Sequence, residues 1–186
     1  ALDDPAFGAN WARYWRDVVL ARKIEDRAMI VANPLVTKLT DSFNENKSWA
    51  KIATEFITAT GNVRENGATA IELAQDGRTE ETTAEVSRIF LGIQIQCAQC
   101  HDHKTDRWKR EQFHEFAAFF PRVAVRPIQS PVERSFEVIS DDRPDLGRKL
   151  PADAQGRRGR GEHYMPDLQD PTAEGTKMQP KYFLTS

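Results

Sequence analysis

Cys97 and Cys100 are the only two cysteines of this 186-residue chain, and His101 follows the second one directly. In a helical turn, residues three and four apart lie on one face, so both thiols and the imidazole would point the same way. Two thiols can add across the two vinyl groups of a haem while an adjacent imidazole binds its iron, and Cys-x-x-Cys-His is the attachment pattern of haem c. The segment therefore predicts a covalently bound haem with His101 as the proximal ligand.

Two other kinds of site fit the same residues. With His103, the motif could supply four ligands to zinc, but zinc sites usually draw their ligands from two separate segments of the chain. The two cysteines could instead form a redox-active dithiol, but the βαβ pattern of thioredoxin-like proteins is absent. Both alternatives stay open, and haem c is the favoured interpretation.

Polar residues directly after the motif could tune the imidazole of His101. A carboxylate at Asp102 or Asp106 would accept an imidazole N–H and fix the orientation of the ring, as such groups do around metal-bound histidines. His103 is expected to be a hydrogen-bonding neighbour. The plainer interpretation is a polar turn that caps the next helix, with Asp106 accepting backbone N–H groups and His103 exposed.

The iron needs a second axial ligand, or an open position, on the haem face opposite His101. His114 ranks first, because the turn after the motif can fold its helix back over the haem, although a lone histidine on such a helix is more often a core residue. Met165 ranks second, because it lies in an irregular segment that is free to reach across, close to His163. An open or water-bound position is nearly as well supported, and no catalytic residue is indicated.

Helical periodicity dominates the first two thirds of the chain. Start signals and apolar spacing predict five helices, beginning near Asp4-Pro5, Asn33-Pro34, Ser48, Thr82 and Thr105-Asp106. The helix that begins at Ser48 is expected to end near Gly61. In the first helix, one stripe of large side chains is expected to face the core: Phe7, Trp11, Tyr14, Trp15 and Val18.

Beyond Pro121 prolines recur and the helical period is lost. Residues 134–140 alternate like a short strand, and residues 155–162 form an Arg/Gly loop. The predicted fold is mainly α, with about five helices packed around a covalently attached haem, an irregular C-terminal arm and at most a short β element. We expect a helical haem-binding domain over residues 1–126 and a Pro/Gly-rich arm over residues 127–186 packed on the same domain.

The charge balance excludes two broad classes of partner. The chain has 26 basic and 28 acidic residues, for a net charge of -2, so nothing favours nucleic acid or an anionic membrane surface. No apolar run in the chain approaches the length of a transmembrane helix, and its first residues predict the start of a helix in place of an apolar signal-peptide core. The chain is expected to be a mature protein or a domain of a longer polypeptide.

Several stretches of the chain resemble those of a known family in their residues and in their order along the sequence. They are CAQCHDHKTDRWKREQFHEFAAFFPRVAVRP, GANWARYWRDVV, SWAKIATEFITATGNVRENGATA, EVSRIFLGIQIQCAQCHDH, YMPDLQDP and KMQPKYF. Together they resemble the planctomycete-type cytochrome-like family, second type, a domain of unknown function. The resemblance covers residues 1–126 well and residues 162–184 fairly.

The resemblance implies a module of long exported proteins, with haem c on Cys97, Cys100 and His101 and with another cytochrome-like domain nearby. Many members have an aromatic residue and then a proline in the stretch that matches Thr105 to Trp108, where this chain has TDRW. This departure leaves the local surroundings of the haem open. The implied partners are redox domains of the same polypeptide or other cytochromes.

Three functions follow from these residues. The first is an electron-transfer module in the periplasm or cell envelope, since haem is attached to reduced thiols outside the cytoplasm. The second is a haem enzyme or sensor with an open iron site for a small molecule or a carbohydrate-derived substrate. The third is a zinc-stabilised binding module, or a carbohydrate- or partner-binding one. Scattered tryptophans are typical of such binding modules, but Trp11, Trp15 and Trp49 lie on helical stripes and are expected in the core.

Overall fold

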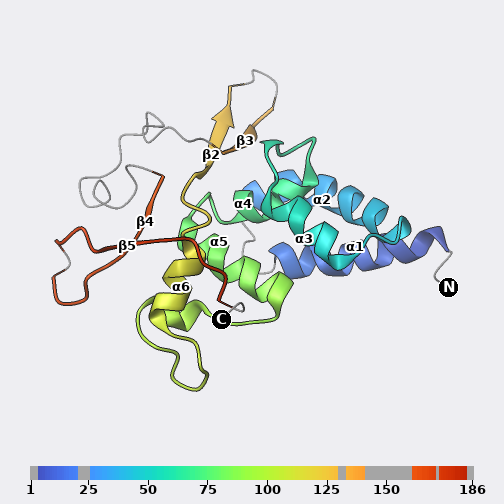
Figure 1. Cartoon of the computed structure of the whole chain (residues 1–186). Helices are drawn as coiled ribbons and strands as arrows, with labels where there is room; N and C mark the ends of the chain where they lie inside the picture. Colours follow the sequence, from blue (N-terminus) through green and yellow to red (C-terminus); the bar gives the residue numbers. More distant parts are fainter. Residues whose placement is uncertain (1–3, 21–25, 130–132, 141–160, 171, 184–186) are drawn as a thin grey trace. The chain divides into compact units, whose positions relative to one another are not determined.

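The computed structural model of the protein describes all residues except 1–3, 21–25, 130–132, 141–160, 171 and 184–186. Its described residues form six α-helices and two small sheets (Figure 1). The predicted mainly α class is therefore confirmed, and five short strands stand where a short β element at most was expected. None of the helices in the described part of the chain is long and apolar enough to cross a membrane.

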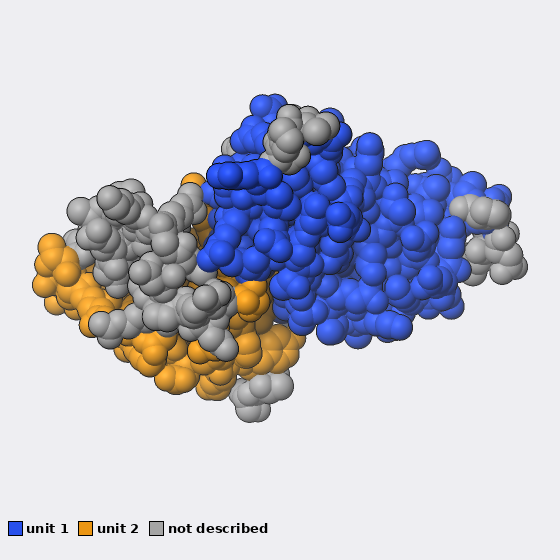
Figure 2. All heavy atoms as spheres, turned by 90° about the horizontal axis from the view of Figure 1, so that it is seen from above, with its two compact units in different colours: residues 1–77, 89–91, 124–139 blue, residues 78–88, 92–123, 140–186 orange. Residues whose placement is uncertain are grey.

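The chain divides into two compact units, which are coloured separately in Figure 2. Unit 1 contains residues 1–77, 89–91 and 124–139, and unit 2 contains residues 78–88, 92–123 and 140–186. The predicted boundary at residue 126 falls inside strand β2 (Val123–Ile128). Of the Arg/Gly loop at 155–162, only Gly161 and Glu162 lie among the described residues.

Unit 1 is built mainly from helices, with one small sheet. The helices are α1 (Pro5–Leu20), α2 (Asp26–Asn44), α3 (Trp49–Ile57) and α4 (Ala70–Ala74), and a 3₁₀ turn (Gly67–Thr69) precedes α4. The sheet has the order β1–β3–β2, with β1 (Gly61–Asn62) antiparallel to β3 (Ser135–Ser140). The strand predicted at 134–140 is thus confirmed as β3.

The buried face of α1 is made of small residues. Gly8, Ala12 and Val19 are buried, whereas Trp11 and Tyr14 are 46% and 57% exposed. A Cβ on Gly8 would lie 2.3 Å from Oδ1 of Asn44, so α1 lies too close to α2 for larger side chains on this face. The expectation that the aromatic stripe faces the core was wrong for Trp11 and Tyr14, because close helix packing selected the neighbouring stripe of small residues.

Helix α2 begins at Asp26, and the predicted start at Asn33-Pro34 was wrong. Pro34 lies inside the helix, where it removes one backbone hydrogen bond. The buried stripe of α2 runs past it on both sides: Ala28, Val31, Leu35, Leu39 and Ser42. Packing of this continuous stripe outweighs the local preference of proline for a helix start.

Helix α3 begins as predicted. Oγ of Ser48 accepts the backbone N–H of Lys51 at 3.3 Å and caps the helix. The helix ends at Ile57, and Gly61 lies in β1 with φ of +103° instead of closing the helix. Trp49 at its start packs against Trp15 with ring centroids 4.4 Å apart and planes inclined by 44°, and both rings are half-buried.

Unit 2 carries the cysteines. Helix α5 (Thr79–Val86) continues as a π-helical stretch (Ser87–Leu91) and stops at Gly92, whose φ of +68° is accessible to glycine at little cost. A 3₁₀ turn (Gln96–Gln99) follows and contains Cys97. The predicted helix from about Thr82 therefore exists, but it ends before the cysteines.

Helix α6 (Arg110–Ala117) begins later than the predicted start near Thr105 or Asp106. The N–H of His103 donates to the carbonyl oxygen of Trp108 at 2.8 Å, which closes a loop in place of a helical turn. The side chains predicted to point inward from this segment are all buried: Trp108, Phe113, Phe116, Ala117 and Phe120. Strands β4 (His163–Met165) and β5 (Thr176–Met178) form an antiparallel pair in the same unit.

Candidate functional site

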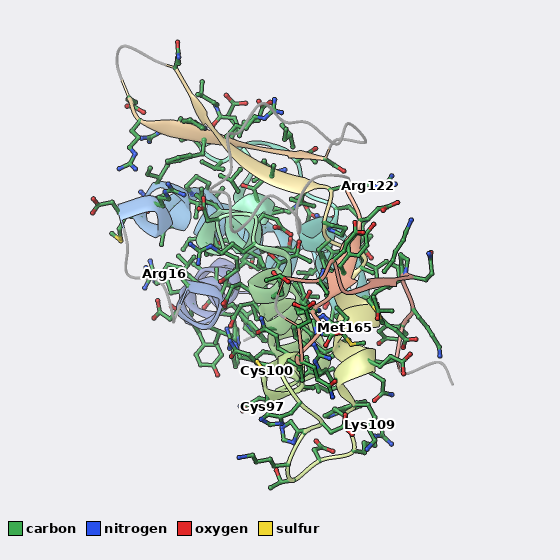
Figure 3. The ribbon with its side chains drawn as sticks, turned by 90° about the vertical axis from the view of Figure 1, so that its left-hand side faces the viewer. Arg16, Cys97, Cys100, Lys109, Arg122 and Met165 are labelled. Carbon is green, nitrogen blue, oxygen red and sulfur yellow. The ribbon has the colours of Figure 1, made fainter. Side chains whose placement is uncertain are left out.

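The cysteine turn, residues 96–101, presents two free thiols to solvent. Cys97 and Cys100 are both exposed and unpaired, whereas Ile95 and Ala98 on the inner side are completely buried. Figure 3 shows the two cysteines next to one another at the start of the loop that ends at Lys109. Burial of the two apolar side chains holds the turn on the unit and directs the cysteines outward.

His101 is exposed, and one of its ring nitrogens is already engaged. Nδ1 lies 2.7 Å from the backbone carbonyl oxygen of Asp102. Because a carbonyl oxygen only accepts hydrogen bonds, Nδ1 of His101 carries the hydrogen and Nε2 keeps its lone pair. A hydrogen bond from the second ring nitrogen to a backbone carbonyl is the usual arrangement around a metal-bound histidine.

These three residues fit a covalently attached haem. Cys97 and Cys100 are free and exposed, and His101 makes its hydrogen bond through Nδ1, so Nε2 is the nitrogen that would bind iron. The tautomer of His101 is the one that iron binding through Nε2 requires. Two observations carry this fit: the exposed position of both cysteines in the turn, and the hydrogen bond of His101 through Nδ1.

The side chain of Asp102 caps α6. Its Oδ1 accepts the backbone N–H of Arg110 at 3.0 Å, and its Oδ2 accepts from Nζ of Lys109 at 2.8 Å. These hydrogen bonds, first that from Lys109 and then that from Arg110, lower the pKa of Asp102 below its usual value. Asp102 thus orients His101 through its backbone carbonyl, while its carboxylate fastens the loop to the helix.

His103 and Asp106 are engaged within the loop. Nδ1 of His103 accepts the backbone N–H groups of Thr105 at 3.3 Å and Asp106 at 3.0 Å, and Oδ1 of Asp106 accepts the N–H of Arg107 at 2.7 Å. Both partners of His103 are therefore backbone groups. This is the geometry of a polar capping turn, in which Asp102 has the role that the sequence suggested for Asp106.

His114 lies beneath the cysteine turn and is almost completely buried. Its Nε2 lies 3.0 Å from the carbonyl oxygen of Gln99, and its Nδ1 lies 2.8 Å from Nε2 of His163. Burial, the largest cause, lowers the pKa of both histidines to about 4. Both rings are therefore neutral at pH 7, and His114 could bind iron only by giving up a hydrogen bond.

Met165 lies at the end of β4 and lines an open pocket of about 630 Å³. Arg110 lines the same pocket and donates from Nη2 to the carbonyl oxygen of Pro166 at 2.5 Å. The backbone N–H of Arg110 also binds the carboxylate of Asp102, the residue next to His101. Arg110 thus connects the pocket to the loop that follows the cysteine turn.

The four candidate zinc ligands do not converge. Within the described ranges, no group of three or more His, Cys, Asp and Glu side chains is placed to hold a metal ion. Cys97, Cys100, His101 and His103 all lie in these ranges, and His103 uses its Nδ1 on backbone N–H groups. The arrangement gives the zinc hypothesis no support.

The pairing of His114 with His163 was not predicted from the sequence. The two residues are 49 positions apart, and no local spacing connects them. No sequence signal marks the contact, because the strand that begins at His163 has only three residues. The contact becomes visible only when β4 is placed on α6.

Fold and site together define a mainly helical module with an exposed Cys-x-x-Cys-His turn. The chain belongs to the PSCyt2 family, described as a protein of unknown function (DUF1549), whose model matches residues 1–125. This match confirms the family resemblance for that range, and the resemblance over residues 162–184 stays a prediction. Neither a curated protein nor a solved structure matches the chain.

Proposed function

We propose that this chain is a c-type cytochrome domain that binds one haem and transfers single electrons. The observation that carries the proposal is the cysteine turn, with two free exposed thiols beside an imidazole whose Nδ1 is held by a backbone carbonyl. Cys97 and Cys100 would hold the haem through thioether bonds, and His101 would bind its iron through Nε2. The bound haem would supply a one-electron redox centre.

The attachment chemistry needs no oxidant. Each thiol adds across one vinyl double bond: the sulfur forms the new C–S bond, and the thiol hydrogen ends on the neighbouring carbon. The two thiols must stay reduced for this addition, and Cys97 and Cys100 are both free. Because such attachment occurs outside the cytoplasm, the proposal includes export to the periplasm or cell envelope.

The hydrogen bonds and positions of the candidate residues also indicate which one would bind the iron opposite His101. The hydrogen bonds of His114 to Gln99 and His163 weigh against its release to the iron. Met165 lines an open pocket and donates no hydrogen bond through its side chain, so its sulfur is the better candidate. An open position is the remaining choice, and a filled one favours electron transfer over chemistry at the iron.

The electron partners would be redox domains of the same polypeptide or other cytochromes. The solvent exposure of the cysteine turn supports this assignment, since an exposed attachment site lets a partner approach closely. The net charge of -2 gives no general preference for nucleic acid or for a membrane surface.

One observation favours a second function, a haem enzyme or sensor. The pocket of about 630 Å³ at Met165 is open, and Arg110 lines it with a cationic group. If the iron has an open position, this pocket could admit a small molecule or a carbohydrate-derived substrate. The two functions differ in whether an added ligand reaches the iron.

The proposal is tested by expressing the chain with a c-type haem maturation system. Intact mass should exceed that of the polypeptide by one haem, and a pyridine haemochrome spectrum should show two saturated vinyl groups. A mass equal to that of the bare chain, together with one bound zinc ion, would contradict the proposal and favour the zinc module. The variant Gln94→Ser, at an exposed position before the turn, serves as a control that should keep its haem.

The two haem functions are separated by adding CO to the ferrous protein. Slow or absent binding in the wild type, with rapid binding in Met165→Ala, would identify a methionine-ligated electron carrier. Rapid binding in both would identify an open site. Leu168→Ala is the matched control, because Leu168 lines the same pocket and has no atom that binds iron.

A further inference from the structure

His114 and His163 form a buried pair that the proposed attachment chemistry does not use. Their ring planes are inclined by only 21°, with centroids 5.1 Å apart, and the two residues are only 1% and 5% exposed. Burying two imidazoles is unfavourable unless their polar atoms find partners. The hydrogen-bond partners of His114 and His163 therefore indicate the role of this buried pair.

The direction of each hydrogen bond follows from Gln99. Its carbonyl oxygen can only accept, so Nε2 of His114, at 3.0 Å, carries the hydrogen. His114 is neutral, so its Nδ1 has a lone pair and accepts the N–H at Nε2 of His163, at 2.8 Å. Both imidazoles are thus Nε2–H tautomers, and donation runs from His163 to His114 and on to Gln99.

We propose that His114 and His163 are positioning residues that set the orientation of the cysteine turn for haem attachment. Gln99 stands directly before Cys100 and two residues before His101, so fixing its carbonyl fixes the peptide that leads to both. The turn Gln96–Gln99 is a short 3₁₀ helix, which has few internal hydrogen bonds and poor hydrogen-bond geometry. The inference rests on the proposed haem attachment for its purpose, but the hydrogen bonds belong to the haem-free chain.

This role brings a segment outside the family match into the site. His163 lies beyond residues 1–125, and the pairing of β4 with β5 places it opposite Met178. On α6, the ring of Phe113 meets that of His114 nearly at a right angle, with centroids 5.2 Å apart. The support of the cysteine turn is therefore built from α6 and from a strand pair of the C-terminal segment.

The decisive experiment compares two variants of His163 in the full chain. Glutamine keeps an N–H donor at the end of the side chain, whereas leucine fills the site with apolar atoms and donates nothing. We expect His163→Gln to keep most of the covalently attached haem and His163→Leu to lose it at least threefold, measured by intact mass. Equal or better attachment in the leucine variant would overturn the proposal, because simple packing favours leucine in a buried site.

Two controls separate positioning from general loss of stability. Phe113→Leu weakens the same core without touching a hydrogen bond of the pair, and Tyr164→Phe removes only the hydroxyl group that donates to Glu162 from the same strand. At equal thermal stability, Phe113→Leu should attach more haem than His163→Leu. If attachment in all variants follows the Tm alone, the role is merely structural and the proposal fails.

A second measurement does not depend on haem. In the haem-free double variant Cys97→Ser, Cys100→Ser, imidazole ¹⁵N shifts should show His114 and His163 as Nε2–H tautomers. Backbone amide shifts of residues 97–101 should change with His163→Leu and stay close to the starting values with His163→Gln. If the wild type does not take up haem, the proposed function fails but this inference stands. If His114 has the other tautomer, or if the amide shifts of residues 97–101 do not change in His163→Leu, this inference is overturned.

Discussion

The cysteine turn and the histidine pair are joined by one hydrogen bond, from His114 to Gln99, yet they are built in opposite ways. The turn is a contiguous stretch whose cysteines and His101 are exposed, and its chemistry can be read from spacing alone. The pair is buried, and its members are 49 residues apart. The reactive groups of this site are thus local and accessible, whereas the groups that hold them are distant in sequence and shielded from water.

This difference predicts a division of effects. Changes in the turn should abolish cofactor binding while leaving the haem-free fold intact, because the thiols of Cys97 and Cys100 make no contact that the fold needs. Changes in the pair should lower the stability of the haem-free fold and should also reduce haem attachment by more than that loss of stability accounts for. The following experiments test this division, from the largest expected effect to the smallest.

Replacing both cysteines gives the largest effect. In Cys97→Ser, Cys100→Ser we expect complete loss of covalent haem, measured by intact mass and by the absorbance of denatured protein. A cofactor that binds only the native state stabilises it, so the haem-free variant should also melt below the haem-loaded wild type. Cooperative melting at the wild-type temperature would show that the fold does not depend on haem.

Removing the central imidazole should be the most destabilising change in the haem-free chain. His114→Phe leaves the donor of His163 and the carbonyl of Gln99 without their partner, and each unsatisfied buried group costs about 1–3 kcal/mol. We expect the free energy of unfolding in urea to fall by about 2–4 kcal/mol. The two serine substitutions should change it by less than about 0.5 kcal/mol, as for other exposed positions. Similar losses of unfolding free energy in His114→Phe and in the double serine variant would contradict the contrast between the pair and the turn.

Lowering the pH should destabilise the fold through the buried histidine pair. Burial lowers the pKa of His114 and His163 to about 4, so between pH 6.5 and 4 the unfolded chain binds more protons than the folded one. Stability is therefore lost as the pH falls through this window. The shift corresponds to at most about 3 kcal/mol for each residue.

Urea unfolding at pH 7, 5.5 and 4.5 measures this dependence. Asp102 and Glu55 have lowered pKa values and contribute with the same sign at lower pH, so His163→Gln is needed to isolate the pair. The variant should show a clearly smaller loss of stability between pH 7 and 4.5 than the wild type. An unchanged slope would mean that the histidines are not neutral and buried in solution.

The smallest effect should come from the cap of α6. Asp102→Asn keeps an oxygen for the N–H of Arg110 but loses the ion pair with Lys109, which lies in solvent. Exposed ion pairs contribute little, so the Tm should decrease only slightly. Asp102→Ala should lower it further because it also removes the cap. Asp106→Ala is the matched control, since Asp106 accepts the N–H of Arg107 within the loop and makes no bond to α6 among the described residues.

The features that could be predicted from the sequence are those with a short-range cause. Ser48 caps α3 through the N–H three residues on, and the alternation at 134–140 is strand β3. The inward-facing residues of α6 follow its helical period. Each of these depends on residues close together in the chain, where spacing determines geometry.

The features that failed depend on contacts between distant segments. The close approach of α1 to α2 at Gly8 decides which stripe of α1 is buried, and the aromatic residues gave the opposite signal. Pro34 fits inside α2 because buried residues continue on both sides of it. The strands β4 and β5 have three residues each, which is too short for alternation to be recognised. In each case tertiary packing overrides a local preference.

For the candidate site, the motif Cys97, Cys100 and His101 could be named from spacing, but the function of its neighbours could not. Asp102 was expected to orient an imidazole through its carboxylate, and that carboxylate instead binds α6. Both assignments require an acidic residue after the motif, so residue type alone does not separate them. Only the position of the first turn of α6 decides between them.

The loop between His103 and Trp108 has a consequence for protein engineering. Its ends are tied together by the backbone hydrogen bond of those two residues, and Lys104 to Arg107 between them are all exposed. Lengthening a loop whose ends stay closed adds little entropy cost, and exposed loop tips are the places where insertions are accepted. A short peptide tag inserted here would attach the protein to an electrode next to the cysteine turn, and voltammetry of the attached protein would test the proposed redox function.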